Sequence, residues 1–149
     1  MRRAWFWIVG KTGTSRLLRW LHPPLYRWTG GAGLAGGSLG NLTILLTTVG
    51  SRSGEARTAA LWAYPDGDSL TVVGSRGGGR RTPAWVYNLR AHPEATVQVG
   101  REMRRMRARE ATGEEYARLW QLVNAAYPGY EAYRTWARRE IPLVVLEPA

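Results

Sequence analysis

From Leu42 to the end of the chain, short apolar runs alternate with turn residues at regular spacing. This spacing is typical of an antiparallel barrel or sandwich. The alternation is clearest where Ala95, Val97 and Val99 face inward and the residues between them face outward. We therefore predict one mainly β domain over residues 41–149, with strands at Leu42–Val49, Thr58–Tyr64, Leu70–Gly74, Ala95–Val99, Met103–Glu110 and Ile141–Glu147.

Helical patterns separate some of these strands. Thr82-Pro83 supplies an N-cap and a first-turn proline for a helix that ends near Ala91. The segment Thr112–Glu115 predicts a capping box that opens a second helix. A third helix is expected after the break at Tyr127–Gly129, and its aromatic residues share one side: Tyr130, Tyr133 and Trp136. The predicted order is strands, a short helix, strands, two helices and a last strand.

Residues 1–40 form a basic, tryptophan-rich arm, and no acidic residue precedes Glu55. The apolar run Trp5–Val9 is far too short to span a bilayer, and it lacks the cleavage site of a signal peptide. Such an arm suits the surface of an anionic membrane. The alternative is that its tryptophans pack on the barrel or on a second subunit. Thr29–Gly40 is predicted to be a flexible linker rather than a phosphate loop, because no Gly-Lys-Ser/Thr ending is present.

Composition excludes several kinds of chemistry. The 149-residue chain has no cysteine, so disulfides and thiol nucleophiles are ruled out. His22 and His92 lie far apart without a cluster of acids, and we expect neither a metal site nor a catalytic triad. The net charge of +10 indicates an anionic partner: a nucleic acid, a membrane or a ligand. The arginines of Met103–Glu110 are interpreted as a solvated strand face, and no nucleic acid is expected, because no base-stacking aromatics are interleaved.

The candidate chemistry is concentrated between Thr47 and Asn88. Two loops rich in Gly, Ser and Arg, Gly50–Arg57 and Ser75–Arg81, are separated by a β-hairpin pattern. Loops of this kind offer backbone N–H groups and guanidinium groups to phosphates and carboxylates. The alternative for each loop alone is a turn that uses glycine for a positive φ. Since no reactive side chains accompany the loops, a reaction here would depend on an organic cofactor.

Four segments resemble the actinobacterial deazaflavin-dependent nitroreductase family, whose members use coenzyme F420: LLTTVGSRSGEART, the SRGG loop running into TPAWVYNLRAHP, AAYPGYEAY and IPLVVLEP. The resemblance covers about Thr29 to the end. It implies an α+β fold, a split β-barrel of the FMN-binding type with short helices packed on it. It also implies hydride transfer from reduced F420 to a quinone, nitroaromatic or enone-type acceptor, with membrane menaquinone as the physiological candidate. The alternatives are an FMN- or haem-binding split-barrel protein, a non-enzymatic cofactor carrier and a basic binding module.

The resemblance carries a set of site residues onto this sequence. The cofactor-binding residues are Arg52 and Arg57 for the phosphate and anionic tail, Leu61 and Trp62 beside the ring, Gly74, Ser75, Arg76, Gly77 and Gly78 around the phosphate linker, and Trp85 and Asn88 behind the pocket. The acceptor side is formed by Tyr127, Tyr130 and Tyr133. Ser75 or Tyr130 is expected to hydrogen-bond the acceptor oxygen or to supply a proton. Main-chain N–H groups near Leu61 and Trp62 are expected to stabilise negative charge on the ring.

The chain departs from the family pattern at two positions in the anion loops. Ser51 stands where many relatives have Arg or Lys, and Arg76 stands where some have Lys. These departures bear on tail affinity and acceptor choice rather than on the cofactor class. The expected location is cytoplasmic, with peripheral contact at the inner face of the cell membrane, and the expected assembly is a homodimer.

Overall fold

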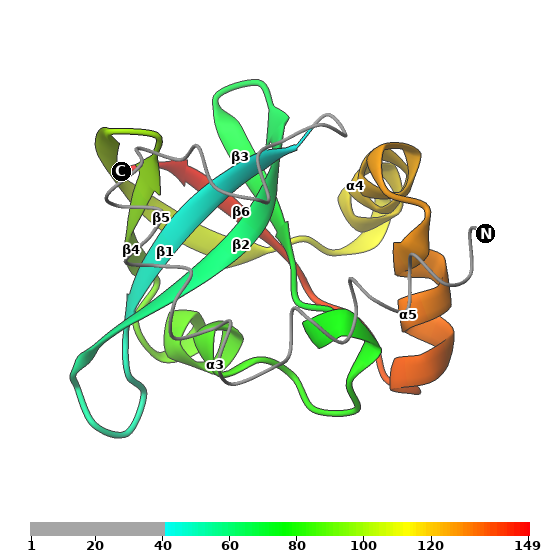
Figure 1. The fold of residues 1–149 in the computed structure, drawn as a ribbon, viewed down its shortest axis with the longest axis horizontal. Coiled ribbons are helices and arrows are strands. Elements are labelled where there is room, and N and C mark those ends of the chain that lie inside the picture. The colour runs from blue at the N-terminus through cyan, green and yellow to red at the C-terminus, as the bar shows by residue number, and fades with distance from the viewer. Residues whose placement is uncertain (1–40) are drawn as a thin grey trace.

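The computed structural model describes residues 41–149, so the expected arm and glycine-rich linker lie outside the described residues. Figure 1 shows the elements in the predicted order. The strands are β1 (Leu42–Val49), β2 (Ala56–Asp66), β3 (Ser69–Val73), β4 (Glu94–Val99), β5 (Glu102–Glu110) and β6 (Leu143–Pro148). The helices are the 3-10 turn η1 (Arg76–Gly78), α3 (Ala84–Ala91), α4 (Gly113–Ala126) and α5 (Gly129–Ala137).

The strands close into an antiparallel barrel in the order β1-β2-β3-β6-β5-β4. Closure depends on β1, which pairs with β2 along its whole length and with β4 through Ile44–Thr47. Pairing on both sides leaves most strands without a free edge, which limits edge-to-edge association. The predicted mainly β fold with helices packed on it is confirmed.

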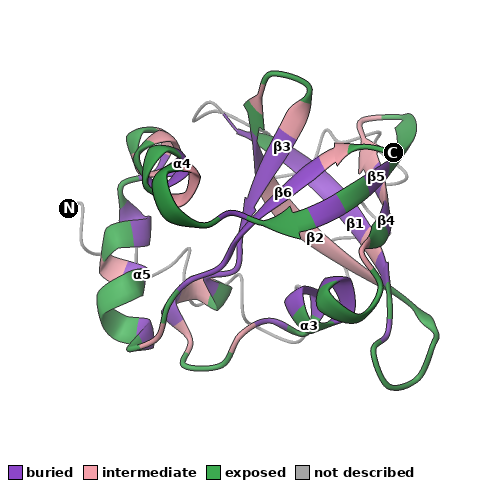
Figure 2. Cartoon of the chain, turned by 180° about the vertical axis from the view of Figure 1, so that it is seen from behind, coloured by how far each residue is buried: buried purple, intermediate pink, exposed green. Residues whose placement is uncertain are grey.

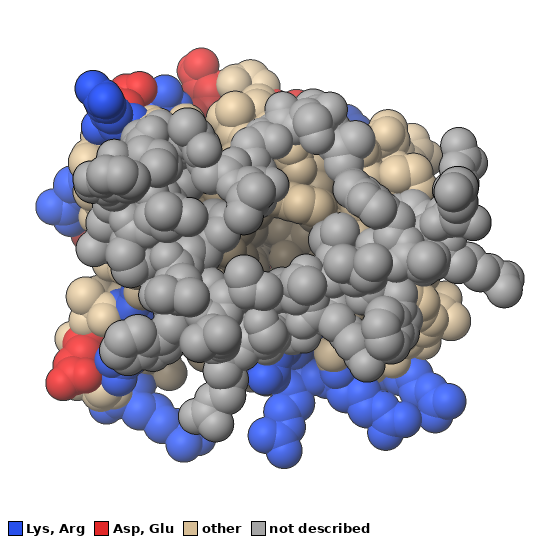
Figure 3. All heavy atoms as spheres, in the orientation of Figure 1, with Lys and Arg blue, Asp and Glu red and all other residues tan. Residues whose placement is uncertain are grey.

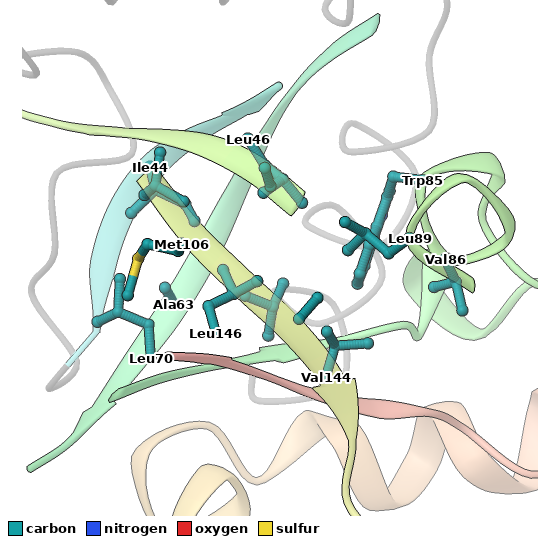
Figure 4. Packing of buried hydrophobic residues seen from close by; sticks show 14 residues of the cluster. Ile44, Leu46, Ala63, Leu70, Trp85, Val86, Leu89, Met106, Val144 and Leu146 are labelled. Atoms are coloured by element: carbon teal, nitrogen blue, oxygen red, sulfur yellow. The ribbon is translucent and has the colours of Figure 1, made fainter. Parts of the chain in front are cut away.

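Alternation along the strands builds two separate cores. Val144 and Leu146 of β6 face the barrel interior, whereas Leu143 and Val145 face α4 and α5. Because both faces of β6 are covered, its sequence is a continuous apolar run, and Figure 2 shows the strand buried over most of its length. Figure 4 shows the interior core, in which Trp85 of α3 lies at one end of the barrel.

The barrel is split along one side of β2. Residues Ala63–Asp66 pair with β3, but residues 56–62 pair only with β1 among the described strands. After Val73 the chain leaves the sheet and enters η1. The first half of β2 therefore has one edge whose backbone groups are not used by the sheet.

Two predicted helix starts differ in detail from the structure. Pro83 is the N-cap of α3 and its helical residues begin at Ala84, one residue later than predicted. Thr112 is the N-cap of α4, as expected, but its side chain makes no capping hydrogen bond. The predicted capping box is wrong because the Glu115 carboxylate instead accepts two hydrogen bonds from Arg109.

Three arginines of β5, Arg104, Arg105 and Arg109, form ion pairs on the barrel surface. Arg105 pairs with Glu94 at 3.0 Å, and Arg109 also pairs with Glu147 at 2.9 Å. These side chains are well exposed, so each pair contributes little to stability. The interpretation of β5 as a solvated strand face is confirmed. Within residues 41–149 no helix has both the length and the apolar character needed to cross a membrane.

Candidate functional site

The β1–β2 loop is tied to α3 by the side chain of Asn88. Its Oδ1 accepts a hydrogen bond from the Ser51 N–H at 2.9 Å, and its Nδ2 donates to the Thr48 Oγ1 at 3.0 Å. Asn88 is buried, so both ends of its amide are already used inside the protein. The structure therefore gives Asn88 a direct role in fixing the loop that carries Arg52.

The two arginines predicted to bind the cofactor tail are both exposed on this hairpin. Arg57 pairs with Glu55 at 3.2 Å, but more than half of each side chain is in solvent. Such a pair is weak and leaves the guanidinium able to bind an anion. Figure 3 shows basic side chains gathered along the lower edge of the molecule, where Figure 1 places this hairpin, α3 and the chain after β3.

The chain after β3 forms a second loop, Gly74–Gly79, with an unusual backbone. Arg76, Gly77 and Gly78 have φ values of 48°, 61° and 82°, all in the left-handed region. Ser75 before them is right-handed, with a φ of −79°. A right-handed residue followed by a left-handed one turns successive N–H groups toward one side, which creates an anion-binding concavity. Within the described chain no backbone hydrogen bond uses the N–H groups of Ser75, Arg76 or Gly77.

This loop packs directly on α5. A Cβ at Gly78 would lie 3.1 Å from Cε3 of Trp136 and 3.3 Å from Cα of Tyr133. A Cβ at Gly74 would lie 3.2 Å from both Pro142 and Val86. The two glycines therefore permit close approach, and Gly78 also needs its positive φ.

Next to the loop, the three predicted tyrosines of the acceptor side form one aromatic cluster. The ring centroids of Tyr127, Tyr130 and Tyr133 lie 5.1–6.0 Å apart, mostly in edge-to-face contacts. The Tyr127 hydroxyl shares a 2.9 Å hydrogen bond with that of Tyr133, and the Tyr130 hydroxyl shares one of 2.7 Å with that of Tyr64. The prediction that these aromatics cluster is confirmed by the ring contacts.

Burial shapes the proton affinity of these hydroxyls. Desolvation raises the pKa of Tyr130 well above its ordinary value, and neighbouring Tyr64 adds to the increase. Burial likewise raises the pKa of Tyr127 and of Tyr133. All three are therefore neutral hydroxyls at pH 7, which donate hydrogen bonds but are weaker acids than free tyrosine.

The strand predicted to lie beside the ring divides its side chains between the two cores. Leu61 packs against the interior core, whereas Trp62 contacts the ring of Tyr127 at 5.3 Å between centroids. Both lie on the half of β2 that has an unpaired edge. Trp85 is buried in the interior core on α3.

The structure thus brings together one group of the predicted residues. The Gly74–Gly78 loop, the tyrosine cluster and Trp62 are joined through α5. Arg52 and Arg57 lie on the separate β1–β2 hairpin, along the same lower edge (Figure 1).

Two residues and one contact in this region were missed by sequence reasoning. Arg139 donates to carbonyls of the Gly74–Gly79 loop, and Tyr64 binds Tyr130. Trp136 was expected among the tyrosines, but its contact with Gly78 was not. Arg139 is one of several arginines in a polar stretch, and the sequence around it does not indicate its contacts with a loop 60 residues earlier in the chain. Tyr64 could have been found from the alternation of β2, which places it on the same face as Trp62.

These residues fit the expected deazaflavin cofactor. The unused N–H groups of residues 75–77 suit a phosphate, and the exposed arginines of the hairpin suit an anionic tail. The unpaired edge of β2 and the nearby aromatic rings suit a flat ring with polar edges. No group of three or more His, Cys, Asp or Glu side chains that could hold a metal ion occurs within residues 41–149.

Comparison with known proteins identifies similar chains. The profile of a family described as F420H(2)-dependent quinone reductase matches residues 6–148. The chain is 36% identical over 145 residues to an F420H(2)-dependent quinone reductase of Mycobacterium tuberculosis, and the match covers 94% of this chain and 95% of the relative.

Two solved structures are similar as well. An F420-H2 dependent reductase called FDR-A is 36% identical, with a TM-score of 0.65, over 70% of this chain and 93% of that chain. A structure described as a domain-swapped dimer is 32% identical, with a TM-score of 0.67, over 86% of this chain and 97% of that chain.

Proposed function

Because the chain belongs to the F420H(2)-dependent quinone reductase family, we propose that it transfers a hydride from reduced F420 to a quinone, with menaquinone in a membrane as the physiological acceptor. The chain is an F420H2-dependent oxidoreductase, its cofactor is coenzyme F420, and its barrel is the split β-barrel. The observation that best supports the proposal is the Gly74–Gly79 loop, which has unused N–H groups and packs through Gly78 on α5, the helix that carries Tyr130 and Tyr133.

The proposed site divides the cofactor among three parts of the barrel. Arg52 and Arg57 bind the anionic tail, and the Gly74–Gly78 loop binds the phosphate through backbone N–H groups. Trp62 and the unpaired edge of β2 lie beside the ring. Trp85 and Asn88 support this arrangement from behind, since both are buried on α3.

When bound, the reduced deazaflavin supplies the hydride from its C5 carbon. The protein's contribution is orientation and electrostatics. N–H groups on the unpaired edge of β2 stabilise negative charge on the pyrimidine side of the ring. Ser75 donates a hydrogen bond to the acceptor oxygen, because its hydroxyl makes no hydrogen bond with the described residues and lies in the same loop.

Tyr130 is the second proposed proton source, and its geometry sets a condition. Its hydroxyl is shared with Tyr64 and is almost completely buried. To donate to an acceptor, the Tyr130 hydroxyl must accept the hydrogen bond from Tyr64 rather than donate it, and the 2.7 Å contact permits this because either hydroxyl can be the donor. Tyr127 and Tyr133 complete the acceptor side of the ring.

The arm and the assembly are also part of the proposal. We assign residues 1–40 to a basic arm that brings residues 41–149 to the inner face of an anionic membrane, where a menaquinone is available. The arm's arginines and tryptophans support this assignment. A homodimer is proposed because a 32%-identical structure is described as a domain-swapped dimer.

The direct test is a titration of purified full-length protein with oxidised F420 and, separately, with FMN, followed by tryptophan quenching. Reduced F420 is then mixed with a soluble menaquinone analogue while cofactor oxidation is recorded. We expect F420 to bind more tightly than FMN and to be oxidised only when the acceptor is present. Tight binding without turnover would instead identify a cofactor carrier.

The membrane assignment is tested separately by sedimentation with vesicles of anionic lipid. Changing Trp5 and Trp7 together to Ser is expected to reduce co-sedimentation while leaving F420 affinity unchanged. The exposed tryptophan Trp136 of α5, changed to Ser, serves as a control for sedimentation that lies outside the arm. Equal sedimentation of the wild type and the arm variant would show that the arm does not bind the membrane.

A further inference from the structure

Arg139 lies between α5 and β6 and is bound to the Gly74–Gly79 loop from behind. Its Nε donates to the Gly79 carbonyl at 3.1 Å. Its Nη2 donates to the carbonyls of Gly74 and Ser75, at 3.1 Å and 3.2 Å. A single rigid guanidinium therefore joins the beginning and the end of the loop.

These hydrogen bonds fix the direction of the loop's N–H groups as well. The carbonyl of one residue and the N–H of the next belong to the same planar trans peptide and point in opposite directions. No cis peptide occurs in the described chain. Because the Gly74 and Ser75 carbonyls point toward Arg139, the N–H groups of Ser75 and Arg76 point away from it. These are two of the N–H groups that no backbone hydrogen bond uses within residues 41–149.

The charge of Arg139 is also uncompensated locally. Among the described residues no carboxylate forms an ion pair with it, and its hydrogen-bond acceptors are all backbone carbonyls. Its side chain is partly buried, and this burial lowers the pKa of the guanidinium; nearby Tyr87 raises the pKa and nearby Arg76 lowers it. Arginine still remains charged at pH 7. A fixed positive charge thus lies directly behind a row of outward N–H groups.

We propose that Arg139 is a positioning residue for the cofactor, holding the loop so that the Ser75 and Arg76 N–H groups meet its phosphate. This inference rests on the proposed function. Arg139 does not itself touch the phosphate in this arrangement, since its donors face the loop carbonyls. Its contribution is to orient the backbone and to place a positive charge behind it.

The test compares two ligands with the full-length protein: F420 and the same deazaflavin ring with its ribityl chain but without phosphate. Arg139→Ala is expected to weaken F420 binding by about tenfold or more, because the phosphate loses the two N–H donors of Ser75 and Arg76 that Arg139 orients. Binding of the phosphate-free compound should change by less than about twofold. General destabilisation of the fold would weaken both ligands together, so the ratio of the two affinities isolates the positioning role.

Arg139→Lys keeps the charge but cannot bridge carbonyls at both ends of the loop, and it also serves if the alanine variant does not fold. We expect Lys to weaken F420 binding nearly as much as Ala. The matched control is Arg138→Ala, which removes an exposed neighbouring arginine and should leave both affinities unchanged.

Two results would overturn the inference: wild-type F420 affinity in Arg139→Lys, or equal losses for both ligands. Failure of the proposed function is recognised separately, because the wild-type protein would then bind neither ligand.

Discussion

Replacing Gly78 with Ala tests whether the loop after β3 must lie directly against α5. Gly78 has a φ of 82°, and an added Cβ would lie 3.1 Å from the Trp136 ring and 3.3 Å from the Tyr133 Cα. The Trp136 side chain is half exposed and can move. The Tyr133 Cα belongs to the helix backbone and cannot move without shifting α5. We therefore expect the loop rather than the helix to be displaced.

The magnitude separates into strain and crowding. An alanine held at positive φ costs roughly 1–2 kcal/mol of unfolding free energy, and crowding in a packed site costs typically about 1–3 kcal/mol more. Gly67, in the β2–β3 turn, provides the control, because its φ is 61° and nothing lies within 4 Å of an added Cβ. Gly67→Ala should show the strain alone. The difference between the two variants measures the contact with α5.

Both variants are measured by urea denaturation and by F420 titration with tryptophan quenching. Gly78→Ala should lose roughly twice as much stability as Gly67→Ala, by the estimates above. It should also lose F420 affinity, whereas Gly67→Ala should bind normally. Equal stability losses together with normal binding by Gly78→Ala would refute the close approach and its role in the site.

Three further predictions concern buried polar groups near the site. Asn88→Ala should lower the free energy of unfolding by about 1–3 kcal/mol, because Ser51 and Thr48 lose their hydrogen-bond partner. It should also weaken the binding of F420 but not of its phosphate-free analogue. Unchanged urea melts would contradict this. Tyr130→Phe should lower kcat with little change in F420 affinity if Tyr130 supplies the proton, and a normal kcat in stopped-flow assays would rule that role out. Stability should be independent of these tyrosines below pH 10 and should fall above it, because burial raises the pKa of Tyr64 and Tyr130 while the unfolded chain ionises near the ordinary value of 10. Above pH 10 the free energy of unfolding should fall by about 1.4 kcal/mol per pH unit for each buried tyrosine. Urea melts from pH 8 to 11, with tyrosinate absorbance followed in parallel, measure this fall, and a constant free energy of unfolding would contradict the prediction.

The strands could be predicted because their alternation is local and strong. β1 was predicted with its observed bounds, Leu42–Val49, and the remaining strands differ by a few residues at their ends. The largest extension is in β2, where Pro65 and Asp66 belong to the strand although they resemble a turn. They pair with Leu70 and Ser69, and this pairing with β3 outweighs the local preference of the two residues.

The capping box illustrates why side-chain partners are harder to predict than element positions. The segment Thr112–Glu115 correctly located the start of α4, because the N-terminal preference of its residues is local. The expected reciprocal hydrogen bonds were absent, because Arg109 on β5 is close enough to bind Glu115. Nothing within the four-residue motif indicates that competitor. Asn88 shows the same limit, because its partners lie about 40 residues away on the hairpin.

The site depends on α5 in a way that neither loop shows by itself. One side of the helix carries Tyr130 and Tyr133, its backbone at Tyr133 supports Gly78, and Arg139 follows shortly after its end. The proposed phosphate contact and the proposed acceptor side therefore share one rigid element. Tyr133 participates in both, through its Cα toward Gly78 and its hydroxyl toward Tyr127. A displacement of the loop then shifts the tyrosine hydroxyls too, so a change confined to the phosphate side should also alter how the acceptor is held.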